Sequence, residues 1–166
     1  HNEEFNDEYH GQGGPLNVAA LRTDNPFQQV YVNAAKEAGF SINRDFNGAS
    51  QEGLGPYQVT QINGERCSAA RGYLHPHMGQ RSNLVVETGA QVLNIIFEGK
   101  RAVGVRFQQQ GKTRELRCKR EVLLSAGAFQ SPQILMLSGV GPAKHLREHG
   151  IEVVHDLAGV GQNLQD

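Results

Sequence analysis

Histidines are the first residues in this chain that could do chemistry, because two pairs of them have a spacing that suits metal binding. His75 and His77 are separated by one residue, and His145 and His149 lie four residues apart on an expected helix. Metal sites in proteins usually need three or four protein ligands. Neither pair has a third ligand at a clear spacing, so we expect no metal site. The position of His149 near a helix C-terminus is favoured by the helix dipole alone.

The two cysteines and the serines give no sign of a nucleophile. Cys67 and Cys118 lie far apart and outside any C-x-x-C or zinc-binding spacing, so we expect reduced thiols. The sequence has no G-x-S-x-G elbow, which argues against an esterase.

Glycine pairs are the third feature, because glycine-rich turns can hold phosphates. Gly139–Gly141 and Gly159–Gly161 both read G-V-G, but neither has the third glycine or the strand–turn–helix context of a dinucleotide fingerprint. We interpret both as turns.

The stretch from residue 121 to 141 is the element most able to position a ligand. An apolar run at Glu121–Ser125 predicts a buried strand, and the small residues Ala126–Ala128 would let a ligand or a backbone approach its end. Ser131 is expected to be the N-cap of a helix with Pro132 at its first position. In α/β proteins a strand, a small-residue turn and a helix commonly form a ligand site.

The remaining pattern predicts a mixed α/β (α+β) fold. A helix capped by Asn25 and closed by Gly39 should bury one face, which carries Phe27, Val30 and Tyr31. Turn signals stand at Asp45–Gly48 and Asn63–Gly64. Beyond these we expect strands at Gly55–Gln61 and Ile151–His155, and short helices at Ser68–Leu74 and from Pro142 to Gly150. Four further strands should form an antiparallel meander: Leu84–Glu87, Gln91–Phe97, Ala102–Gln108 and Thr113–Lys119.

Composition and charge narrow the classes of partner. The chain has 166 residues with a formal net charge of −1, which gives no reason to expect nucleic acid or an anionic membrane. Half of the basic residues lie between Lys100 and Arg120, and we interpret them as solvated strand edges. No apolar run approaches the ~18 residues of a membrane span.

The letters of Gly127–Gly141, GAFQSPQILMLSGVG, resemble the second signature of the glucose–methanol–choline (GMC) family of flavin-dependent oxidoreductases. They are most similar to its bacterial choline dehydrogenase and alcohol dehydrogenase branch. Four further stretches are similar to family motifs, with Gly72 in place of alanine and Ala158 in place of proline: Gly11–Val18, Asp45–Gly48, Gly64–Pro76 and Gly159–Asp166.

The resemblance implies a central part of a longer protein. In the family, the dinucleotide fingerprint and the active-site histidine belong to regions outside residues 1–166, so we expect no catalytic residue here. Residues 1–44 would belong to the substrate domain, 45–155 to an FAD-binding domain with parallel strands and a meander, and 156–166 to a connector toward the substrate domain.

The resemblance also implies three FAD-binding residues. Val92 would meet the adenine through its main chain, and Ala126 and Gly127 would lie beside the dinucleotide. From the residues alone, Val92 is equally a core strand residue, and Ala126 and Gly127 equally mark close helix–strand packing.

The implied function is that of an FAD-dependent alcohol (choline-like) dehydrogenase, with the 166-residue chain inactive by itself. A non-catalytic α/β module that binds a nucleotide or a protein is the alternative. The expected partners are an alcohol substrate, the remainder of the parent polypeptide and, through uncovered apolar surface, further copies of the chain. We expect a cytoplasmic location, with peripheral attachment of the parent to the inner membrane left open.

Overall fold

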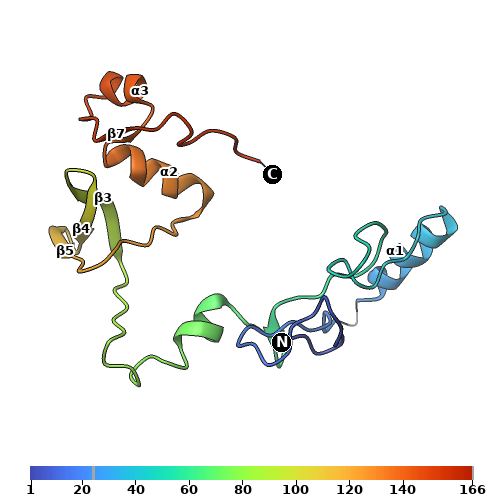
Figure 1. The fold of residues 1–166 in the computed structure, drawn as a ribbon. Coiled ribbons are helices and arrows are strands. Elements are labelled where there is room, and N and C mark those ends of the chain that lie inside the picture. The colour runs from blue at the N-terminus through green and yellow to red at the C-terminus, as the bar shows by residue number, and fades with distance from the viewer. Residues whose placement is uncertain (24, 166) are drawn as a thin grey trace. The chain divides into compact units, whose positions relative to one another are not determined.

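The computed structural model describes residues 1–23 and 25–165 and divides the chain into two compact units, His1–Val85 and Val86–Asp166. Figure 1 shows the elements of each unit along the chain. Within the described residues, no helix combines the length and the hydropathy that crossing a membrane requires.

The first unit contains the predicted helix α1, Pro26–Glu37. The Asn25 side chain caps it by accepting a hydrogen bond from the Phe27 N–H at 3.1 Å. The prediction of a buried face is wrong, because Phe27, Val30 and Tyr31 are 75%, 60% and 63% exposed and only Ala35 is buried. The strands of this unit are too short to offer a sheet that α1 could cover.

Those strands form one small hairpin, β1 (Gln61–Ile62) and β2 (Glu65–Arg66). The predicted turn joins them, and Asn63 and Gly64 both have the positive φ that a tight hairpin turn requires. Of the predicted strand Gly55–Gln61, only Gln61 is in a strand, and Val59 forms an isolated bridge with Ala19. The predicted short helix is a π-helix, η1 (Ala70–Leu74). Ser68 precedes it, and its hydroxyl oxygen accepts a hydrogen bond from the N–H of Arg71 within the helix.

The second unit is built on the predicted antiparallel meander. Its strands are β3 (Ala90–Glu98), β4 (Arg101–Gln109) and β5 (Lys112–Arg117), in that spatial order. Every residue of β5 is exposed, as a solvated edge strand requires. Leu84–Glu87 was expected as a further strand, but it has no pairing partner and is irregular.

Helix α2, Gly127–Leu137, corrects two predictions. It begins before Ser131, so Ser131 is not the N-cap and Pro132 lies inside the helix; Ala126 is the N-cap instead. Glu121–Ser125 is not a strand, because no neighbouring strand in the described residues supplies its hydrogen bonds.

The last elements complete the core of the second unit. Strands β6 (Val140–Gly141) and β7 (His155–Asp156) pair in parallel. Between them in sequence lies α3 (Ala143–Glu148), which is shorter than the predicted helix from Pro142 to Gly150 and has Pro142 as its N-cap. Of the predicted strand Ile151–His155, only His155 is in a strand, and β7 continues to Asp156. The core of the unit consists of Ile95, Ile134, Val140, Ala143, Leu146 and Val160.

Candidate functional site

A cavity of about 310 Å³ lies between β3 and α2 in the second unit. Val92, half-buried, lines it from the strand, and Ile134, buried, lines it from the helix. None of the residues around it is titratable, so the cavity offers contacts for binding and no group for proton transfer. Its lining consists of Gln91, Val92, Leu93, Gln130, Gln133, Ile134 and Leu137.

Ser138 fixes the two walls of this cavity to each other. Its side chain, at the C-terminal end of α2, is buried, and its hydroxyl oxygen accepts the Ile95 N–H of β3 at 2.7 Å. The same hydroxyl donates to the Ile134 carbonyl oxygen within the helix. The α2–β3 spacing is thus set by a hydrogen bond as well as by apolar packing.

Strand β3 has one backbone edge that no other strand of the described residues pairs with. It is an edge strand of the three-stranded sheet, and a bulge between Val92 and Asn94 interrupts its pairing with β4. The Gln91 side-chain amide donates to the Val92 carbonyl oxygen at 3.4 Å. A ligand amine could replace this long contact, so the backbone at Val92 fits the role that the resemblance assigns to it.

Ala126 and Gly127 lie at the N-terminal end of α2 and do not line this cavity. Ala126 donates its N–H to the Ser131 hydroxyl oxygen at 3.1 Å. Gly127 has a φ of +88°, and a Cβ added to it would meet no atom within 4 Å. Close helix–strand packing therefore does not explain this glycine, whereas its backbone conformation does.

The histidine pairs and cysteines do not assemble into a larger site. The rings of His145 and His149 meet edge to face with their centroids 4.7 Å apart. In the part of the chain that the structure describes, no three His, Cys, Asp or Glu side chains are grouped to hold a metal ion. Cys67 is buried and Cys118 half-buried, and both are free thiols.

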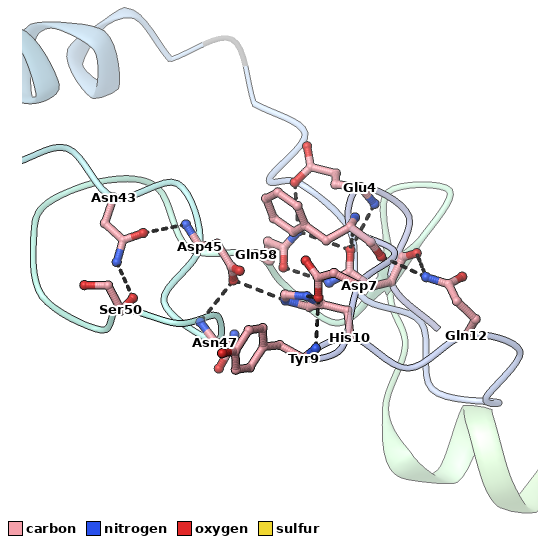
Figure 2. A network of polar contacts seen from close by, with 12 residues as sticks. Glu4, Asp7, Tyr9, His10, Gln12, Asn43, Asp45, Asn47, Ser50 and Gln58 are labelled. Carbon is pink, nitrogen blue, oxygen red and sulfur yellow. Dashed lines mark hydrogen bonds and ion pairs between the residues drawn. The ribbon is translucent and has the colours of Figure 1, made fainter.

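A cluster in the first unit was not predicted from the sequence. Figure 2 shows His10 between the carboxylates of Asp7 and Asp45. The three-residue spacing of Asp7 and His10 is a weak signal for a contact. Asp45 is distant in sequence, and nothing in the residue pattern indicates that it meets His10. The hydrogen bond between Ser138 and Ile95 of β3 likewise has no sequence signal.

Comparison with known protein families and sequences gives a consistent result. The GMC oxidoreductase family model matches residues 2–166. An alcohol dehydrogenase [acceptor] of Pseudomonas putida is 48% identical over all of this chain and 30% of its own length. An oxygen-dependent choline dehydrogenase of Chromohalobacter salexigens is 50% identical over 96% of the chain and 29% of its own length. The chain thus spans about 30% of the length of these curated relatives.

Solved structures show the same relationship. A pyridoxine 4-oxidase from Mesorbium loti matches 95% of this chain and 31% of its own with a TM-score of 0.85 and 30% identity. An FAD-dependent oxidoreductase from Chaetomium thermophilum matches 95% of this chain and 28% of its own, with a TM-score of 0.85 and 34% identity. These likenesses confirm the predicted α/β fold as part of an FAD-binding architecture. The chain belongs to the GMC oxidoreductase family.

Proposed function

We propose that this chain is the central part of an FAD-dependent alcohol (choline-like) dehydrogenase, which oxidises a CH–OH group. The family match over residues 2–166 carries this proposal, because it covers nearly the whole chain. The names of the relatives support an alcohol or choline as substrate. FAD, when bound, supplies the hydride acceptor.

Within this chain, the β3 edge and the start of α2 would hold FAD. The Val92 backbone would bind the adenine, with the Gln91 amide giving up its contact to the Val92 carbonyl oxygen. Ala126 and Gly127 would lie beside the dinucleotide, where the positive φ of Gly127 presents backbone without a side chain. Ser138 would keep the cavity walls in place, since it joins α2 to Ile95.

We expect binding without turnover by the chain alone. A general base must lie within about 2.6–3.2 Å of the proton that it removes, and the resemblance assigns that base to a region outside residues 1–166. In the parent protein the base would come from another part of the polypeptide. The assignment of residues 1–44, 45–155 and 156–166 to substrate domain, FAD domain and connector stays a prediction, and so does the cytoplasmic location.

The proposed function is tested on the protein made from the full reading frame and on the 166-residue chain, both purified. The full protein should show flavin absorbance near ~450 nm and dye-coupled oxidation of choline or a simple primary alcohol. The chain alone should show no turnover with the same substrates. The proposal would be contradicted if the full protein carried no flavin, or if the 166-residue chain alone oxidised these substrates.

A further inference from the structure

The cluster around His10 has a geometry that requires a charged imidazole. Its side chain is only 5% exposed. The Nδ1 atom lies 2.6 Å from Asp7 Oδ1, and the Nε2 atom lies 3.2 Å from Asp45 Oδ1 (Figure 2). A carboxylate only accepts hydrogen bonds, so both ring nitrogens must carry protons for both contacts to exist. A neutral imidazole can keep only one of them.

The two carboxylates belong to segments that no strand or helix joins. Asp7 lies in the N-terminal segment, where its Oδ1 also accepts the Tyr9 N–H at 2.9 Å. Asp45 lies in a turn that Asn43 braces, because the Asn43 Oδ1 accepts the Asp45 N–H at 2.8 Å. His10 therefore connects a local turn of its own segment to a second turn 35 residues away.

These two segments also form walls of a cavity of about 700 Å³ in the first unit. Phe5 lines the cavity, and its ring lies against the His10 ring with centroids 5.1 Å apart. Arg44, the neighbour of Asp45, lines the cavity from the other segment. Helix α1 contributes a further wall through Gln28, Val32 and Lys36. His10, Asp7 and Asp45 do not line the cavity themselves, so its walls would respond to the His10 contacts through the neighbouring Phe5 and Arg44.

We propose that His10 is a proton-dependent clip: as an imidazolium it holds the N-terminal segment against the Asp45 turn, and on losing its proton it releases that turn and loosens the cavity. The inference concerns the first unit alone and is independent of the proposed flavin chemistry. It rests on the two contacts of the buried His10 ring and on the cavity that the two joined segments line.

The direction of the pH dependence follows from the charges that face the ring. Asp7 faces it from its own segment and Asp45 from the opposite turn, while the Phe5 ring is neutral. The hydrogen bond that the His10 ring donates to Asp7 raises the pKa of His10 against the opposing effect of burial, and the same bond lowers the pKa of Asp7. The clip is therefore closed below the raised pKa of His10 and opens as pH rises through it. At the acid end it weakens as Asp7 becomes protonated.

The test combines two measurements on the whole 166-residue chain. Long-range ¹H–¹⁵N NMR of ¹⁵N-histidine-labelled protein should show both His10 nitrogens protonated near pH 6. Amide exchange, expressed as protection factors, should then fall together in residues 2–12 and 43–47 as pH rises toward 8.5. We expect at least about a tenfold fall, because a hydrogen bond to a charged group is lost.

Two variants separate the clip from a general loss of structure. In Asp45→Asn the turn keeps a neutral acceptor, so protection in residues 43–47 should become independent of pH. His75→Gln changes a histidine that contacts no carboxylate among residues 1–23 and 25–165, and it should leave the wild-type profile unchanged. A neutral His10 at pH 6, or protection factors in both segments that do not change with pH in the wild type, would overturn the proposal.

Discussion

Ser138 shows how one hydroxyl group can determine a wall of the site. It is 7% exposed and is the partner of the buried Ile95 N–H. In Ser138→Ala this N–H would lose its acceptor, so we expect the free energy of unfolding to fall by about 1–3 kcal/mol. Urea denaturation of the second unit measures this.

Ser125→Ala is the matched control, since Ser125 is exposed in the same unit. It should change stability by less than about 0.5 kcal/mol. Equal effects of the two substitutions would show that the Ser138–Ile95 hydrogen bond contributes nothing measurable to the free energy of unfolding.

Val92 tests whether adenine is bound by backbone or by side chain. If the backbone binds, Val92→Ala should leave the affinity of the full-length protein for FAD within about threefold. Val92→Pro removes the N–H and fixes the backbone angle φ beside the carbonyl group, so it should lower the affinity at least about tenfold. Flavin fluorescence titration of the apoprotein measures both. Proline is tolerated on edge strands, and circular dichroism verifies the fold. A larger loss in the alanine variant would assign recognition to the side chain.

At the scale of elements, local signals predicted the meander and α1 but missed what depends on distant partners. Alternation and turn glycines placed β3, β4 and β5 close to their observed bounds. The apolar run Glu121–Ser125 looks like a strand, but a strand needs a neighbour, and the described residues provide none. Of the site, the strand that carries Val92 was predicted. The Ser138–Ile95 and His10–Asp45 contacts join residues far apart in sequence, and local patterns do not indicate them.

Gly104 is a position in the meander where a side chain would collide with the neighbouring strand. It is buried in β4, and an added Cβ would run into the Leu116 carbonyl oxygen and lie 3.0 Å from the Arg117 Cα. Gly104→Ala should therefore destabilise the second unit by about 1–3 kcal/mol. Gly159→Ala is the control, because a Cβ there would meet nothing within 4 Å. Thermal melts in which both variants match the wild type would show that β5 shifts freely to make room.

At the scale of the whole molecule, large apolar side chains remain uncovered in both units. Phe27 and Tyr31 in the first unit are 75% and 63% exposed, and Leu123 and Phe129 in the second are 81% and 75% exposed. Exposed apolar groups this large are typical of surfaces that contact other protein. In a parent protein about three times as long, as the relatives are, other parts of the polypeptide would cover them.

We therefore expect the isolated chain to self-associate. Sedimentation velocity should show species larger than the monomer that increase with concentration, and Phe27→Ser/Tyr31→Ser should shift the distribution toward monomer. The control Gln29→Ser/Asn33→Ser exchanges a hydrogen-bonded polar pair on the same helix and should leave the distribution unchanged. A wild-type chain that stays monomeric over the concentration range would contradict this expectation.

The most direct test of the central claim is an FAD footprint on the full-length protein. Hydrogen–deuterium exchange is compared with and without FAD, and peptides from every part of the chain are followed. FAD should slow exchange in residues 90–95 of β3 and in residues 126–131 at the start of α2, while β5 stays unchanged. Exchange in both stretches that does not respond to bound FAD would contradict the assignment of this chain to the flavin site.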